Sequence, residues 1–127
     1  MITWNNLDTL EAFKNLSKAE RVNIAEAMSG ENGAERVKTY STPMAEGLAY
    51  NYAAKQVDDK LLEDLQKLAD EAQLTEKFEA LYNGEVINTG EKRMVLHHLT
   101  RGQLGEAVNA DGTDKRAFYK EQQQKIA

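Results

Sequence analysis

A stripe of leucine and alanine residues, which recurs with the period of an α-helix, limits the possible folds of this chain more than any other pattern. The apolar side chains follow an i, i+4, i+8, i+11 spacing through Val57, Leu61, Leu62, Leu65, Leu68, Ala69 and Ala72. This spacing places them on one face of a helix, and Asp58 stands where an N-cap residue belongs. The pattern therefore predicts a helix over Asp58–Ala72 whose apolar face buries a core.

Two shorter helices are predicted upstream. The first covers Leu7–Leu16, where apolar residues recur every third position after two asparagines that can cap a helix. The second begins at the capping box Ser17–Glu20 and runs to Met28, where Ser29-Gly30 stops it. Residues 31–33 are expected to form a turn or loop.

The segment that follows changes to a period of two residues. Polar and apolar side chains alternate over 37–41 and again over 48–52, and a loop containing Pro43 and Gly47 separates the two runs. This pattern predicts a β-hairpin whose tyrosine-bearing face packs on the helices, since an isolated hairpin is marginal in water.

Three more helices are predicted downstream of the leucine stripe. Leu74 and Phe78 flank Thr75 as a hydrophobic staple and open a helix that Asn83-Gly84 ends. After an extended stretch over 85–89, a helix is expected over Glu91–Arg101, closed by Gly102. A last helix from about Thr113 reaches the final residue without a cap, so we expect it to be cut in mid-course. The expected fold class is mostly α with one β-hairpin (α+β), in a single segment over residues 1–127.

The composition excludes several classes of protein. The 127 residues carry 16 Lys+Arg against 21 Asp+Glu, and the resulting charge of −5 argues against binding to nucleic acid. The absence of cysteine excludes disulfides and thiolate metal sites and fits a cytoplasmic location. No signal peptide and no apolar run long enough to cross a membrane is recognisable.

No residue pattern predicts a catalytic centre. His97 and His98 are adjacent, so on a helix their rings point about 100° apart and do not converge on one metal. We expect one of them to pack against the core and the other to face solvent. In the predicted helix, Arg93, His97 and Arg101 would share one face, which suits either a bound phosphate or pairing with acidic groups; we favour the pairing.

Other familiar arrangements are also missing. The sequence has no phosphate-binding loop, no nucleophile elbow and no cysteine nucleophile. The carboxylates on the 58–72 helix are interpreted as ordinary solvated surface. We assign no catalytic, cofactor-binding or metal-binding residue on this basis.

One segment resembles a known family. Residues 84–101 are similar to the amino-terminal signature of the phosphoglucose isomerase (glucose-6-phosphate isomerase) family, Gly-Glu-x-Ile-Asn-x-Thr-Glu-x-Arg-x-Val-Leu-His-x-x-x-Arg. Ten positions are in register: Gly84, Glu85, Ile87, Asn88, Glu91, Arg93, Val95, Leu96, His97 and Arg101. Gly90 departs from it, because many members have threonine there. Asp111-Gly112, the stretch 48–53 and the 58–72 helix follow the order of the family, so the likeness covers nearly the whole chain.

The resemblance implies what the parent protein does and what this chain contributes. Members are longer enzymes of the sugar-isomerase α/β fold that interconvert glucose 6-phosphate and fructose 6-phosphate without a cofactor. Their phosphate-binding loop, ring-opening histidine and proton-shuttling glutamate come later in the chain, so His97 is not promoted to a catalytic role. The implied partners are the remainder of the isomerase chain, a second subunit in a homodimer and, for the parent only, the hexose phosphate.

We therefore interpret the chain as the helical amino-terminal segment of such an isomerase, inactive by itself. Within the parent, Glu91, Arg93, His97 and Arg101 would be structural residues of the family motif that brace the segment. One alternative is a free-standing anion- or protein-binding module derived from that family. Another is a small metal-dependent enzyme, which is disfavoured because the residues of the sequence do not supply a recognisable set of metal ligands.

Overall fold

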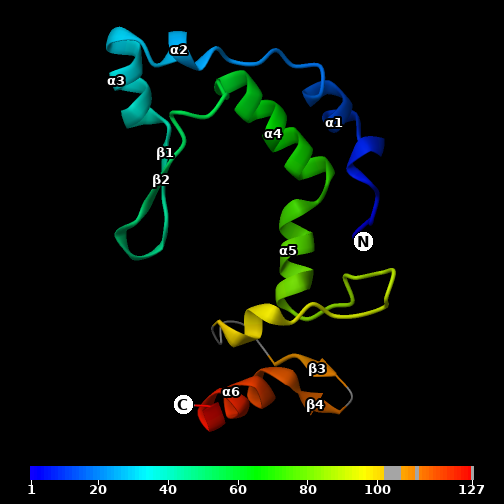
Figure 1. Cartoon of the computed structure of the whole chain (residues 1–127). Helices are drawn as coiled ribbons and strands as arrows, with labels where there is room; N and C mark the ends of the chain where they lie inside the picture. Colours follow the sequence, from blue (N-terminus) through cyan, green and yellow to red (C-terminus); the bar gives the residue numbers. More distant parts are fainter. Residues whose placement is uncertain (102–106, 111, 127) are drawn as a thin grey trace. The chain divides into compact units, whose positions relative to one another are not determined.

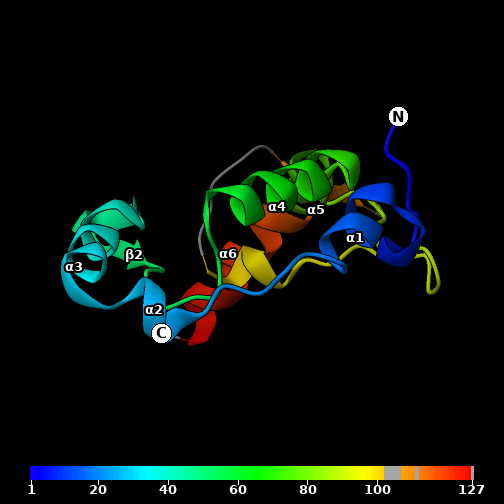
Figure 2. The same cartoon turned by 90° about the horizontal axis from the view of Figure 1, so that it is seen from above.

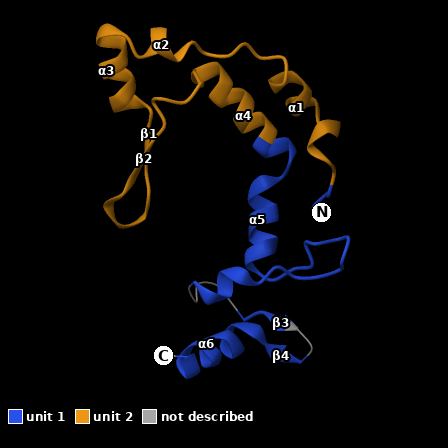
Figure 3. Ribbon diagram, viewed as in Figure 1, with its two compact units in different colours: residues 1–4, 69–127 blue, residues 5–68 orange. Residues whose placement is uncertain are grey.

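The computed structural model of this chain describes residues 1–101, 107–110 and 112–126 (Figure 1). The described residues form short helices and two small antiparallel hairpins, and fall into two compact units (Figure 3). One unit comprises Asn5–Leu68, and the other comprises Met1–Trp4 with residues 69–127. The predicted class, mostly α with a β-hairpin, is confirmed.

The unit Asn5–Leu68 contains the first helices and the larger hairpin. A 3₁₀ turn η1 (Leu7–Thr9) leads into α1 (Glu11–Leu16), and α2 (Ile24–Ala27) and α3 (Gly30–Thr39) follow. The strands β1 (Ser41–Pro43) and β2 (Ala49–Asn51) enclose a second 3₁₀ turn η2 (Ala45–Gly47). The pairing is antiparallel with Thr42 opposite Tyr50, so the predicted hairpin is confirmed. The first strand predicted over 37–41 is wrong in its position, because α3 continues through Thr39 and β1 covers Ser41–Pro43.

The helix predicted from the leucine stripe is present as α4 (Asp59–Glu71), which begins in this unit. The Asp58 carboxylate accepts a hydrogen bond from the Leu61 N–H at 2.8 Å, as expected of an N-cap. Lys60 and Lys67 pair with Asp64 on the polar side of the helix. The expectation that the stripe buries a core is wrong for this chain, because no residue of α4 is fully buried.

Two predictions for residues 17–33 are wrong. The capping box at Ser17–Glu20 does not start a helix; Asn23 caps α2 instead, accepting from the Ala25 N–H at 3.1 Å. The predicted helix end is confirmed, since α2 ends at Ala27 with Met28 as its C-cap. The loop predicted over 31–33 is wrong, because Ser29 is the N-cap of a new helix, α3, that begins at Gly30 and runs through these residues. Gly33 lies so close to Met28 that an added Cβ would be 2.2 Å from the Met28 carbonyl oxygen. This close approach packs the first turn of α3 against the end of α2, a contact between residues five apart that the sequence pattern did not indicate.

The unit that comprises Met1–Trp4 and residues 69–127 holds α5 (Leu74–Tyr82), a third 3₁₀ turn η3 (His97–Thr100), the strands β3 (Asn109–Ala110) and β4 (Thr113–Asp114), and α6 (Lys115–Ile126). The turn η3 lies beside α6 in both views (Figures 1 and 2). Helix α5 starts at Leu74, after Gln73 in the left-handed conformation, so Thr75 is not its cap. Thr3 belongs to this unit because its N–H and hydroxyl both donate to the Gln73 side-chain oxygen.

The buried cores of both units are small. The buried apolar side chains of the described residues are Leu10, Ala53, Ala80, Leu99 and Val108. Two charged residues, Arg36 and Arg116, are buried with them, at 8% and 5% exposure. The last predicted helix, from about Thr113, is confirmed as α6, and its expected end at residue 127 lies outside the described residues.

Candidate functional site

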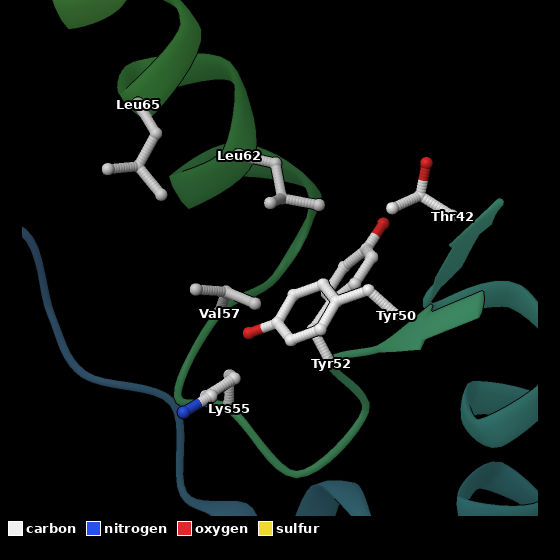
Figure 4. A pocket seen from close by; sticks show the side chains of 7 residues that line it. All are labelled: Thr42, Tyr50, Tyr52, Lys55, Val57, Leu62 and Leu65. Atoms are coloured by element: carbon white, nitrogen blue, oxygen red, sulfur yellow. The ribbon is translucent and has the colours of Figure 1, made fainter. Parts of the chain in front are cut away.

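In the unit Asn5–Leu68, a groove lies between the hairpin and the beginning of α4. It encloses about 400 Å³ and is lined by Thr42, Tyr50, Tyr52, Lys55, Val57, Leu62 and Leu65 (Figure 4). Figure 4 shows the two leucines on the helix, the two tyrosine rings on the hairpin side, and Val57 with Lys55 on the segment that joins them. We call this cavity the hairpin groove.

Both tyrosines reach the groove because successive side chains of a β-strand point to opposite faces of the hairpin. Tyr50 and Tyr52 are two residues apart and therefore point to the same face, where their rings stack with centroids 6.1 Å apart. Tyr52 also meets Tyr40 edge-on at 5.3 Å. Tyr40 is the residue that follows α3, and Tyr50 is 47% exposed, so the expectation that the tyrosine-bearing face packs on the helices is wrong for the described residues.

Arg36 fixes the segment that connects the hairpin to α4. Its Nε donates to the Ala53 carbonyl at 2.7 Å, and its Nη2 donates to the carbonyls of Lys55 and Val57. The guanidinium also lies over the Tyr40 ring, 4.1 Å from its centroid. One buried cation thus holds three carbonyls of the connecting segment, and this positions Lys55 and Val57 at the groove.

A second link joins the hairpin to the start of α4. The Tyr40 hydroxyl donates to the Asp59 carboxylate at 2.8 Å. This hydrogen bond, and after it partial burial, raises the pKa of Tyr40 above its ordinary value, because the carboxylate favours the protonated phenol. Tyr40 and Asp59 therefore fix one end of the groove wall.

The polar groups of the hairpin groove are hydrogen-bond donors. They are the hydroxyls of Thr42, Tyr50 and Tyr52 and the ammonium of Lys55, and none has a hydrogen-bond partner within the described parts of the chain. No carboxylate lines the groove. This arrangement supplies no general base or activated nucleophile, and it suits binding rather than catalysis.

The family-like motif, residues 84–101, lies in the unit that contains residues 69–127. It does not form the predicted helix over Glu91–Arg101. Asn88 and Arg93 instead form an antiparallel bridge with two backbone hydrogen bonds of 3.1 Å. The Asn88 side chain accepts from the Glu91 N–H, and Lys92 has a φ of 54°, which interrupts a helix. Within residues 91–101 only η3 is helical. The predicted helix is therefore wrong, because the Asn88 side chain closes a turn where the helix was expected to begin.

The four predicted site residues are consequently not gathered on one helical face. Glu91, Arg93, His97 and Arg101 are all exposed. The Glu91 carboxylate accepts from the Asn88 side chain at 3.3 Å. The side chains of the other three have no hydrogen bond or ion pair to any residue that the structure describes. Their bracing role within a larger protein stays a prediction.

The structure gathers a different group near the motif, around Tyr82. Its carbonyl accepts from His98 Nε2 at 3.1 Å and from Arg116 Nη2 at 2.6 Å. The Tyr82 ring stacks on the His98 ring at 4.8 Å. His98 is half-buried and His97 is exposed, which confirms the expectation that one histidine packs inward and the other faces solvent.

This Tyr82 cluster is incompletely hydrogen-bonded. Among the described residues, Arg116 Nε and Nη1 and His98 Nδ1 are buried without a hydrogen-bond partner. Because a carbonyl only accepts, the bonded Nε2 of His98 carries the proton and Nδ1 is bare in the neutral ring. Little in the sequence indicates this cluster, since Arg116 stands in a polar helix and its contacts come from a distant part of the chain.

Neither unit offers an evident metal site. Among the described residues, no three His, Cys, Asp or Glu side chains are grouped closely enough to hold a metal ion. Over the same residues, no helix combines the length and apolar content that a membrane crossing requires.

Comparison with known proteins decides the family. The family model described as phosphoglucose isomerase matches residues 51–127, which is more than half of the chain. The chain belongs to the phosphoglucose isomerase family. The matched region includes the Tyr52 side of the hairpin groove, all of α4 and α5, the motif and the Tyr82 cluster.

Curated isomerases resemble the chain over nearly its full length. A glucose-6-phosphate isomerase of Treponema denticola is 50% identical over 97% of this chain, and one of Borreliella afzelii is 40% identical over 99%. One of Shewanella woodyi is 41% identical over 76% of the chain. The chain spans only 24%, 23% and 18% of these relatives, respectively.

Proposed function

We propose that this chain is the amino-terminal segment of a glucose-6-phosphate isomerase and that it serves as scaffold. The parent would interconvert glucose 6-phosphate and fructose 6-phosphate in glycolysis and gluconeogenesis, in the cytoplasm and as a homodimer. The observation that carries the proposal is the 50% identity over 97% of this chain but only 24% of the relative. A segment that aligns end to end with a quarter of an enzyme is expected to share its architecture.

The geometry supports the scaffold role over a catalytic one. The hairpin groove offers donors and apolar walls, and the Tyr82 cluster is closed around a backbone carbonyl. Isomerisation of an open-chain sugar requires a base that moves a proton between neighbouring carbons, and neither place presents a carboxylate poised for this. Those groups would belong to the remainder of the isomerase.

An activity measurement tests the proposal. The isolated 127-residue chain and the uninterrupted protein that contains it are incubated with fructose 6-phosphate, and glucose 6-phosphate is detected by a coupled dehydrogenase. We expect turnover by the uninterrupted protein and none by the isolated chain. Turnover by the isolated chain contradicts the scaffold role, and an inactive uninterrupted protein contradicts the assignment of the parent activity.

A binding module derived from the family is the competing function. It is favoured by the exposed side chains of Arg93, His97 and Arg101, which have no partner in the described residues. Calorimetry of the isolated chain with glucose 6-phosphate separates the two. The scaffold role predicts no saturable heat, whereas the binding module predicts saturable heat that Arg93→Ala removes.

A further inference from the structure

The hairpin groove is an apolar concavity that no other part of the unit Asn5–Leu68 covers. Leu65 and Tyr50, on opposite walls, are 40% and 47% exposed. The cavity volume of about 400 Å³ is within the range of sites that bind small molecules or inserted side chains. Leaving such a surface in water is unfavourable, so an occupant is expected in the complete protein.

The chemistry of the rim specifies that occupant. The walls are aliphatic and aromatic, while the polar groups are three hydroxyls and the Lys55 ammonium, without a carboxylate among the lining residues. The chain as a whole is acidic, with a net charge of −5, so this rim differs from its average surface. An apolar side chain next to a carboxylate matches both parts of the groove, because Lys55 would offset the negative charge.

The size of the groove indicates where the occupant comes from. One cavity of this volume holds one or two large side chains. Separate proteins need many more contacts than these, since a stable specific interface buries roughly 1,200–2,000 Å² in total. A segment tethered to the same chain needs less contact, because its effective concentration is high. The chain spans only about a quarter of these relatives, so about three quarters of their length lies outside the matched region and is available to supply a tethered segment.

We propose that a part of the isomerase chain outside residues 1–127 inserts an apolar side chain between Tyr50 and Leu65 and pairs a neighbouring carboxylate with Lys55. This inference rests on the proposed function, since it takes the chain to be part of a longer isomerase. It identifies the hairpin groove as the surface on which the remainder of that enzyme docks.

Site-specific thiol labelling tests the inference. This chain has no cysteine, so Thr42→Cys and Leu65→Cys each place a single thiol on one wall of the groove. Ala34→Cys, on the exposed surface of α3, is the matched control. Maleimide labelling of each residue is followed by peptide mass spectrometry in the isolated chain and in the uninterrupted isomerase.

We expect both groove thiols to react about tenfold or more slowly in the uninterrupted protein than in the isolated chain, which corresponds to about 1.4 kcal/mol of protection. The control thiol of Ala34→Cys should react at the same rate in both proteins. Adding Lys55→Glu to Thr42→Cys should restore fast labelling, whereas adding Lys18→Glu, an exposed charge reversal outside the groove, should not. Equal rates at the groove thiols in the two proteins overturn the inference.

Two further outcomes are distinguishable. If the groove thiols of the isolated chain become protected as its concentration rises, a second copy is the occupant and the inference is wrong. The activity of the uninterrupted protein is measured separately on the form without added cysteines. An inactive protein with protected groove thiols contradicts the proposed function alone, and an active protein with unprotected thiols contradicts the docking inference alone.

Discussion

Two buried arginines show how differently the same side chain is accommodated in this molecule. Arg36 donates to three carbonyls, whereas Arg116 donates to one, and its Nε and Nη1 have no acceptor among the residues that the structure describes. Both lie near a tyrosine ring. A buried charge is tolerated when its donors are satisfied and costs free energy when they are not.

This difference predicts opposite effects of one substitution. Arg36→Met should lower the free energy of unfolding by about 3 kcal/mol, because three carbonyls lose a charged donor. Arg116→Met should leave the free energy unchanged or raise it by about 1 kcal/mol, because it removes unsatisfied buried donors. Urea denaturation of the isolated chain measures both. Equal losses in the two variants would contradict this account of Arg116.

The hydrogen bond from Tyr40 to Asp59 predicts a dependence on alkaline pH. The folded-state pKa of Tyr40 is raised above its ordinary value, so the stability from this group is fully present below about pH 10 and is lost as pH rises through the folded pKa. Tyr40→Phe should cost about 1 kcal/mol at about pH 8 and less at about pH 11. Urea midpoints at the two pH values test this, and a constant difference would be the contrary result.

At the scale of elements, the end of α5 depends on a glycine for two separate reasons. Gly84 has a φ of +75°, and an added Cβ would lie 2.2 Å from Val108 Cγ1. The backbone conformation disfavours any other residue, and the contact with Val108 leaves no room for a side chain. The Asn83-Gly84 end predicted from the sequence is therefore confirmed and has a packing cause beyond its turn chemistry.

Gly47 provides a matched control for Gly84. It has the same φ of +75°, but nothing lies within 4 Å of an added Cβ. Gly47→Ala should cost about 1 kcal/mol from the backbone conformation alone. Gly84→Ala should cost distinctly more, because Val108 must also move. Thermal unfolding of both variants compares the two contributions; equal costs would show that the Val108 contact relaxes freely.

At the scale of the whole molecule, the chain exposes more large apolar side chains than its cores bury. On α5, Leu74 and Phe78 are 59% and 60% exposed, and the only residue that this helix buries is Ala80. The staple predicted from these two residues therefore leaves both largely in solvent. Surfaces of this kind are expected to meet other parts of a longer protein.

This exposure predicts dye binding by the isolated chain. Under native conditions it should enhance the fluorescence of an apolar dye such as ANS, and Phe78→Gln should reduce the enhancement. The uninterrupted isomerase should bind less dye per molecule, because the same surfaces are covered. Equal dye binding per molecule in the two proteins would show that these side chains stay in solvent.

The order of the amino acids was sufficient for the features that depend on neighbouring residues. The leucine stripe and Asp58 predicted α4 and its N-cap, Asn83-Gly84 predicted the end of α5, and the alternation over 48–52 predicted the second strand. Residues 84–101 identified the family through ten positions at fixed spacing. Short-range periodicity and capping chemistry suffice for these, because the interacting groups are only a few residues apart.

The remaining features arise from contacts that side-chain periodicity does not encode. The contact of Gly33 with Met28 and the bridge between Asn88 and Arg93 join residues only five apart, but they depend on backbone conformation and replaced a predicted loop and a predicted helix. The acceptors around Arg36 are 17 to 21 residues away and surround a buried charge that no pattern singled out, so only the tertiary structure decided them. The hairpin groove likewise exists only because residues 42–65 fold back on themselves and leave its walls uncovered.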